Sequence, residues 1–152
     1  MSYRLFIDPA SISTGWALFK DREFVQSGTV KVSPLLDVYM RIDMICDHYR
    51  ELDIPAIEEV HIEQLVRMTH IFTHYSVGAI GATLVSTKVR VAADVPIKSW
   101  QKHVEWKAKK GQPFTVGGKL QPYVSTVHSQ DELAAIGMGI YWTETKLPKE
   151  DV

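Results

Sequence analysis

Three acidic side chains occupy positions from which they could bind a cation or a phosphate. Asp8 ends the apolar stretch 5–7, Glu63 ends a second, largely apolar stretch at 60–62, and Asp131 opens an apolar helix. A carboxylate at the end of a buried strand is desolvated on one side and open to solvent on the other. Carboxylate oxygens suit Mg²⁺ or Mn²⁺, and the chain offers no Cys/His cluster for zinc. The sequence therefore makes these three residues candidate ligands.

Taken alone, Asp8 also has a purely structural explanation. Asp8 precedes Pro9, a pair common where turns begin, and Gly15 offers the positive φ that a chain reversal can need. Glu132 follows Asp131 and is a further candidate ligand, but neighbouring side chains on a helix point about 100° apart. The recurrence of three acidic sites in one short chain favours the metal-binding interpretation.

The elements that must position these residues follow from hydrophobic periodicity. We expect strands at 4–8, 15–20, 23–30, 58–65 and 88–92, and helices at 34–52, 69–86, 96–104 and 130–144. Ser33 is the expected N-cap of the first helix, with Pro34 at its first position. Three strands followed by alternating helices and strands predict an α/β fold with a mixed five-stranded sheet, an antiparallel meander plus parallel strands, flanked by helices.

Length and composition indicate one domain spanning residues 1–152. The hydrophobic content of 45% and the charged content of 23% are those of an ordinary globular protein. Cys46 is the single cysteine, which excludes an internal disulfide and suggests a buried residue in a reducing cytoplasm. No signal peptide or membrane span is visible, so we expect a cytoplasmic protein without a membrane partner.

Basic residues gather in one part of a chain whose net charge is only −1. Residues 88–119 contain eight basic residues against two acidic ones. Within this region 107–119 has the composition of a loop, and Lys107, Lys109, Lys110 and Lys119 are candidate contacts to DNA phosphates. A solvated loop without a ligand is the alternative. Trp106 precedes it and is the aromatic residue best placed to stack on an unpaired base. Residues from about 147 are expected to be a frayed tail.

The order and spacing of these motifs resemble the RNase H-like superfamily, and more closely RuvC-type Holliday junction resolvases of the small phage kind. The matching motifs are Ile7-Asp8-Pro9 with Thr14-Gly15-Trp16-Ala17, then His61-Ile62-Glu63-Gln64, and the helix start Asp131-Glu132-Leu133-Ala134-Ala135. The resemblance extends over about 4–142. No single motif is specific, whereas their order and spacing are.

The resemblance implies a metal-dependent endonuclease that cleaves branched DNA such as a four-way junction. It casts Asp8 as a ligand shared by two Mg²⁺ or Mn²⁺ ions, Glu63 as a ligand to one of them, and Asp131 as the acid from the last helix. Two such metals about 4 Å apart activate a water and stabilise the departing oxygen. A two-fold symmetric junction further implies a homodimer, acting in the host cytoplasm if the protein is phage-encoded.

Two positions depart from the family's pattern. The family usually has a second acid three residues after the first on the last helix, where this chain has Ala134, through natural divergence or an introduced Asp→Ala change. An aromatic wedge that often follows the fourth-strand acid is replaced by Val66, Arg67 and Met68, and Phe72 is the nearest aromatic residue.

Two other functions are compatible with parts of the sequence. A protein of the same fold could bind junctions or other DNA without cleaving them, and retained affinity without turnover would favour it. An actin-like ATPase also carries an Asp and a Gly-containing turn on its first hairpin, but it needs two domains around its nucleotide. A chain of this length has room for one, so we expect no nucleotide cofactor.

Overall fold

The computed structural model describes residues 2–10, 12–52, 57–66, 70–85, 89–106 and 118–148. Its sheet has five strands in the order β3-β2-β1-β4-β5. They are β1 (Tyr3–Asp8), β2 (Ser13–Lys20), β3 (Glu23–Lys31), β4 (Glu59–Gln64) and β5 (Arg90–Pro96). The first three strands form an antiparallel meander, and β4 and β5 run parallel to β1. The expected mixed five-stranded α/β sheet is therefore confirmed.

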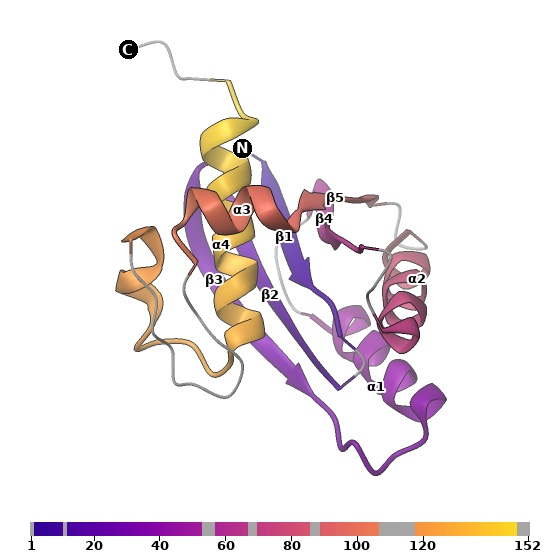
Figure 1. Ribbon diagram of the computed structural model, residues 1–152. Helices are drawn as coiled ribbons and strands as arrows, with labels where there is room; N and C mark the ends of the chain where they lie inside the picture. The colour runs from indigo at the N-terminus through magenta and orange to yellow at the C-terminus, as the bar shows by residue number, and fades with distance from the viewer. Residues whose placement is uncertain are drawn as a thin grey trace.

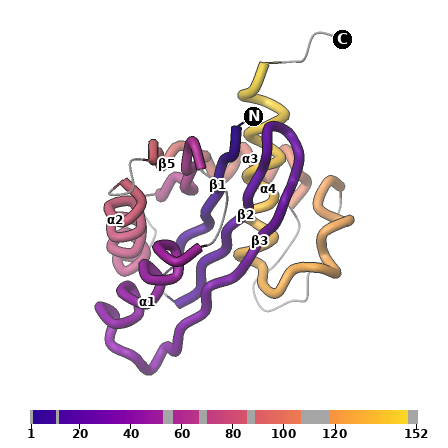
Figure 2. Tube along the Cα trace, turned by 180° about the vertical axis from the view of Figure 1, so that it is seen from behind, coloured from indigo at the N-terminus to yellow at the C-terminus, as the bar shows by residue number. Residues whose placement is uncertain are grey.

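Helices cover both faces of this sheet and make a three-layer structure. The helices are α1 (Val38–Arg50), α2 (Ile71–Val85), α3 (Ile97–His103) and α4 (Gln130–Thr145), and a 3₁₀ helix spans Gly118–Tyr123. Helices α3 and α4 lie together on one face (Figure 1), and α1 and α2 pack on the other, as the view from behind shows (Figure 2).

Strand alternation decides which helix layer each side chain meets. On β1, Phe6 packs in the apolar core under α4, whereas Leu5 and Ile7 pack in the core under α1 and α2. Successive side chains of a strand point to opposite faces, so Asp8 falls on the side of Phe6. On β4, His61 stacks on Phe6 with ring centroids 5.3 Å apart. Glu63, two residues further, shares the face of His61, and both strands thus deliver their acid toward α4.

The first helix begins later than its sequence suggested. Ser33 opens a turn, with its Oγ accepting from the Leu35 N–H, and Leu35 is left 95% exposed. The helix starts at Val38 with Asp37 as its N-cap, whose side chain accepts from the Tyr39 N–H. The prediction of a Ser33 cap with Pro34 at the first helical position was wrong: Asp is as good a cap as Ser, and the buried residues of α1 begin only at Arg41.

Gly15 permits a close approach and does not provide a reversal. It lies within β2 opposite Asp8 and does not have a positive φ; among the described residues, that conformation occurs at Asp21, Glu105 and Gly118. A Cβ at Gly15 would lie 2.1 Å from the Asp131 carbonyl carbon and oxygen. The first turn of α4 is therefore seated directly on the β2 backbone, which fixes where Asp131 stands.

The predicted basic loop falls largely outside the described residues, which resume at 118. Its last two residues, Gly118 and Lys119, belong to the 3₁₀ helix and not to a loop. Helix α4 ends at Thr145. Of the tail predicted from about 147, Leu147 and Pro148 are described, and their carbonyls accept from the Arg22 guanidinium; the rest lies outside the described residues. In the part of the chain that is described, no helix is long and apolar enough to cross a membrane.

Candidate active site

The three candidate ligands from distant parts of the sequence line one cavity. Asp8 at the end of β1, Glu63 near the end of β4 and Asp131 in the first turn of α4 border a volume of about 250 Å³. The other residues around it are Ile97, Trp100, Gln101, Trp106, Gln130 and Ala134. Each of the three acids is half-buried. One face of the site therefore stays accessible to a ligand.

Neighbouring side chains hold two of these carboxylates in place. The buried Trp100 indole N–H donates to Glu63 Oε2 at 2.8 Å, and the Ser13 hydroxyl donates to Asp131 Oδ2 at 2.7 Å. Trp100 also packs edge-on against Trp106 at 5.0 Å between ring centroids. Neither Trp100 nor Ser13 was predicted from the sequence as a site residue. The positions of both follow from pairing across strands and from packing of α3, which local sequence does not encode.

The electrostatics of the cavity favour a cation. Burial, and then the negative charges of Glu63 and Asp131, raise the pKa of Asp8 well above its ordinary value. Burial also raises the pKa of Glu63, with Asp131 adding to the effect and the Trp100 hydrogen bond opposing it. Among the described residues, no lysine or arginine lines this cavity. Three acids thus gather without a basic partner among the described lining residues, and the neighbouring charges add to the cost of ionising Asp8.

The donor set fits a hard divalent ion by its chemistry. Three carboxylates supply only oxygen ligands, which Mg²⁺ and Mn²⁺ prefer. A cation among them would offset the burial and the neighbouring negative charges that raise the pKa of Asp8. As they stand, no three Asp, Glu, His or Cys side chains in the described segments are grouped closely enough to enclose a metal ion. Asp8, Glu63 and Asp131 are the residues that would hold it.

Ala134 lies on the cavity wall. It follows Asp131 by three residues on α4, which places both on one helical face, and it borders the same cavity as Asp8 and Glu63. A side chain at this position therefore points toward the three carboxylates. The methyl group leaves that part of the wall without an oxygen ligand.

Glu132 does not point into the carboxylate cavity, and its prediction as a metal ligand was wrong. It is 2% exposed and faces β3, where its carboxylate accepts from the Ser27 hydroxyl at 2.5 Å and the Thr29 hydroxyl at 2.9 Å. Ser129 caps α4 by accepting from the Glu132 N–H, and Glu132 in turn accepts from the His128 N–H. Ser129-x-x-Glu132 has the sequence of a capping box, although Glu132 accepts from the residue before the cap and not from the cap itself; that sequence signal would have pointed to this structural role.

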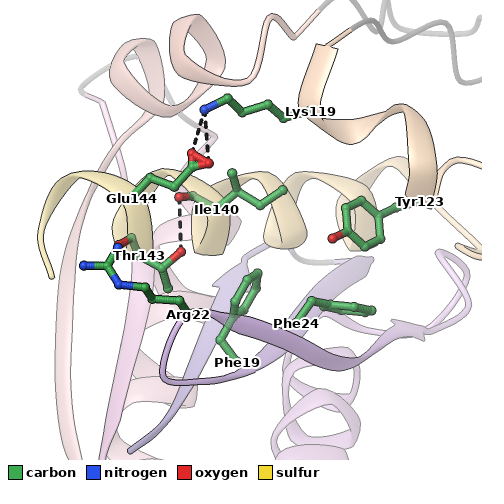
Figure 3. A pocket seen from close by; sticks show the side chains of 8 residues that line it. All are labelled: Phe19, Arg22, Phe24, Lys119, Tyr123, Ile140, Thr143 and Glu144. Carbon is green, nitrogen blue, oxygen red and sulfur yellow. Dashed lines mark hydrogen bonds and ion pairs between the residues drawn. The ribbon is translucent and has the colours of Figure 1, made fainter. Parts of the chain in front are cut away.

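Lys119, the one described member of the four predicted DNA-contacting lysines, lies at a different cavity. Its Nζ is 2.6 Å from Glu144 Oε2, on the rim of a pocket whose floor includes Phe19, Phe24 and Tyr123 (Figure 3). An ammonium paired in this way is less available to a phosphate. Lys107, Lys109 and Lys110 lie outside the described residues. Trp106, by contrast, borders the carboxylate cavity itself.

Comparisons with known proteins connect this fold to one class of solved structures. No protein-family model and no curated relative matches the sequence. The structure of T. thermophilus RuvC in complex with a Holliday junction substrate matches with a TM-score of 0.67, covering 96% of this chain and 97% of that one at 14% identity. A second Thermus thermophilus RuvC structure matches with a TM-score of 0.64 over 93% and 95% of the two chains at 13% identity. The chain therefore has the RNase H-like fold in the form found in RuvC.

Proposed function

We propose that this protein is a divalent-metal-dependent endonuclease that cleaves branched DNA, with a four-way junction as its substrate. The observation that carries the proposal is the meeting of Asp8, Glu63 and Asp131, from β1, β4 and α4, in one half-open cavity. The fold likeness to RuvC, solved with a Holliday junction, supports the choice of substrate. At 14% identity that likeness concerns the fold, so the activity rests on the site.

The chain's own residues provide a negatively charged, pre-oriented ligand set. Trp100 and Ser13 fix the carboxylates of Glu63 and Asp131, so that less ordering remains when metal and substrate bind. Asp8 lies between the other two acids and would be the ligand shared by two metal ions. Bound Mg²⁺ or Mn²⁺ would supply an activated water and charge stabilisation at the phosphodiester. The expected products carry a 5′-phosphate and a 3′-hydroxyl.

Ala134 favours a second candidate function, a junction-binding protein without turnover. The cavity presents three carboxylates where a fourth would fit, and fewer ligands weaken metal binding. One measurement distinguishes the endonuclease from the junction-binding protein. A labelled synthetic four-way junction is incubated with the protein in Mg²⁺ or Mn²⁺, with EDTA as control. Metal-dependent nicks with 5′-phosphate ends support the endonuclease; saturable binding without nicks supports the alternative.

Trp100→Phe should weaken the site without removing a ligand. The substitution keeps an aromatic ring in the core but leaves Glu63 Oε2 without its 2.8 Å donor. Loss of a residue that orients a metal ligand costs about 10- to 100-fold in metal affinity or activity. We expect cleavage to need a correspondingly higher Mg²⁺ concentration, measured by metal titration of the nicking rate. An unchanged metal requirement would show that Trp100 only packs.

Helix α2 carries a surface suited to a second copy of the chain, as a two-fold symmetric substrate requires. Its solvent-facing stripe consists of Ile71, Tyr75, Gly78, Ala82 and Val85, spaced four and three residues apart. Ile71, Tyr75 and Val85 are 55%, 47% and 57% exposed. We therefore extend the proposal to a homodimer that buries this stripe against itself.

Gly78→Arg tests the dimer. A Cβ at Gly78 meets no atom within 4 Å, so the substitution leaves the monomer fold intact while obstructing the stripe. Light scattering during size-exclusion chromatography should give a dimer mass for the unchanged protein and a monomer mass for Gly78→Arg. Lys102→Gln on α3, across the sheet, is the control and should stay dimeric. A dimer that survives Gly78→Arg would place the interface elsewhere.

A further inference from the structure

A second cavity lies on the other side of the β1–β2 connection. It has a volume of about 390 Å³ and is lined by Ala10, Ile12, Arg41, His70, Phe72 and Thr73. These residues come from the connection that follows Asp8, from the first turn of α1 and from the start of α2. The Ser76 hydroxyl donates to the Ala10 carbonyl at 3.0 Å, which ties α2 to that connection. The described residues that line this cavity include none that line the carboxylate cavity, although Ala10 lies only two positions after Asp8.

Arg41 is a buried cation whose charge no described neighbour neutralises. The residue is only 8% exposed, and its Nε has no hydrogen-bond partner. Among the described residues its side chain takes part in no ion pair, while Arg4, Arg50 and Arg90 each contact a carboxylate. A buried charge without a partner is costly to maintain, and buried guanidinium groups normally have one. The cavity that Arg41 lines contains no acidic residue.

The start of α2 adds further hydrogen-bond donors to the cavity and an electrostatic field that favours an anion. The N-terminus of this 15-residue helix opens at the cavity, and its dipole favours a negative charge there. His70 Nδ1 accepts from the Phe72 N–H at 3.2 Å, so in the neutral ring the proton is on Nε2, which is then a donor. The hydroxyl of Thr73 lines the same space. A guanidinium, an imidazole N–H and a hydroxyl together suit a tetrahedral oxyanion.

We propose that the Arg41 cavity binds a phosphate group, and that this phosphate belongs to the DNA backbone held beside the active site. The choice of an anion follows from Arg41 and the α2 N-terminus alone. The choice of DNA rests on the proposed function: the β1–β2 connection borders this cavity through Ala10 and Ile12, and Asp8 precedes it in the catalytic cavity. A DNA strand that passes over this edge of the sheet would reach both cavities.

Inorganic phosphate is the first probe, in thermal unfolding at constant ionic strength. The unchanged protein should show a Tm that rises with phosphate and then saturates, because a bound ion stabilises the folded state by mass action. Arg41→Met should lose the saturable rise in Tm. Arg41→Lys keeps the charge but not the planar guanidinium group, and should retain part of the rise. Arg50→Gln, on the same helix but paired with Asp47, is the matched control and should respond like the unchanged protein. An equal response of Arg41→Met and the unchanged protein would overturn the site.

Junction binding at several salt concentrations decides whether the phosphate comes from DNA. Arg41→Met should bind a labelled junction about tenfold more weakly, and the slope of log affinity against log salt should fall by about 1. Arg50→Gln should change neither. Loss of the phosphate response with unchanged junction binding would overturn the DNA assignment. If neither the unchanged protein nor Asp8→Asn binds the junction, the proposed function itself fails, while the phosphate titration still decides the anion site.

Discussion

Asp8→Asn is expected to abolish cleavage and at the same time to stabilise the protein. The amide keeps the shape of the side chain but removes the charge that would bridge the metals, so the cleavage rate should fall by about 10³-fold or more. Replacing this acid by an amide also removes the cost of ionising a buried group beside two other acids, the two causes that raise the pKa of Asp8. Stability should rise by about 1 kcal/mol, which in a chain of this size is about 3 °C in Tm.

The gain in stability should depend on pH in a defined direction. Because the pKa of Asp8 is raised in the folded state, the folded protein keeps a proton that the unfolded chain loses at its ordinary value near ~4. Stability therefore falls as pH rises from that value through the raised pKa. The advantage of Asp8→Asn should be small near pH ~4 and full above the raised pKa.

Asp43→Asn is the control for this prediction. Asp43 is an exposed residue of α1, remote from the cavity, and its substitution should alter neither cleavage nor the pH dependence. Differential scanning calorimetry from acid to neutral pH, in metal-free buffer, measures the effect. A lower Tm for Asp8→Asn at neutral pH would mean that Asp8 stabilises the fold as a hydrogen-bonded carboxylate, which conflicts with a ligand role.

Gly15→Ala should damage both the fold and the site, although it adds a single methyl group. The new Cβ would lie 2.1 Å from the Asp131 carbonyl carbon and oxygen and 2.2 Å from the Glu132 nitrogen. These are backbone atoms that no rotamer change can move aside, so the start of α4 must shift. We expect a loss of about 2–3 kcal/mol and, because Asp131 moves with the helix, about a 10²-fold slower cleavage.

Gly81→Ala is the matched control for this substitution. A Cβ at Gly81 meets nothing within 4 Å, and alanine is the better helix former, so stability should stay equal or increase by up to about 1 kcal/mol. Chemical denaturation gives the stability difference, and the nicking assay gives the rate. Wild-type stability and activity in Gly15→Ala would mean that α4 is not seated on β2 as described.

The positions of Asp8 and Glu63 could be predicted because local sequence encodes them. Alternation along β1 and β4 fixes which face each side chain occupies, and the order of strands and helices predicts the mixed sheet. Asp131 was also predictable as a first-turn acid. Its contact with Ser13 was not, since it joins residues 118 positions apart through the seating of α4 on Gly15.

Charged side chains were harder to place, because the same residue type can bind a ligand or hold the fold together. Glu132 has the chemistry of a ligand, but the His128 N–H and two hydroxyls of β3 already donate to its carboxylate. Lys119 was predicted to contact DNA from local composition, and that stays a prediction; the 3₁₀ helix brings its Nζ to Glu144. Arg41 was not singled out in the sequence, where it is one position of a predicted helix. Its lack of a partner emerges only when α1, α2 and the β1–β2 connection are assembled around it.

Cleavage of a labelled four-way junction by the unchanged chain, Ala134→Asp and Asp8→Asn tests the central claim most directly. Ala134 lines the cavity three residues after Asp131, so an aspartate there adds a fourth oxygen ligand. We predict metal-dependent, paired nicks that are about tenfold or more faster with Ala134→Asp than with the unchanged chain, and none with Asp8→Asn. If all three bind the junction and none cuts it in Mg²⁺ or Mn²⁺, the endonuclease assignment is wrong and the protein is a DNA-binding one.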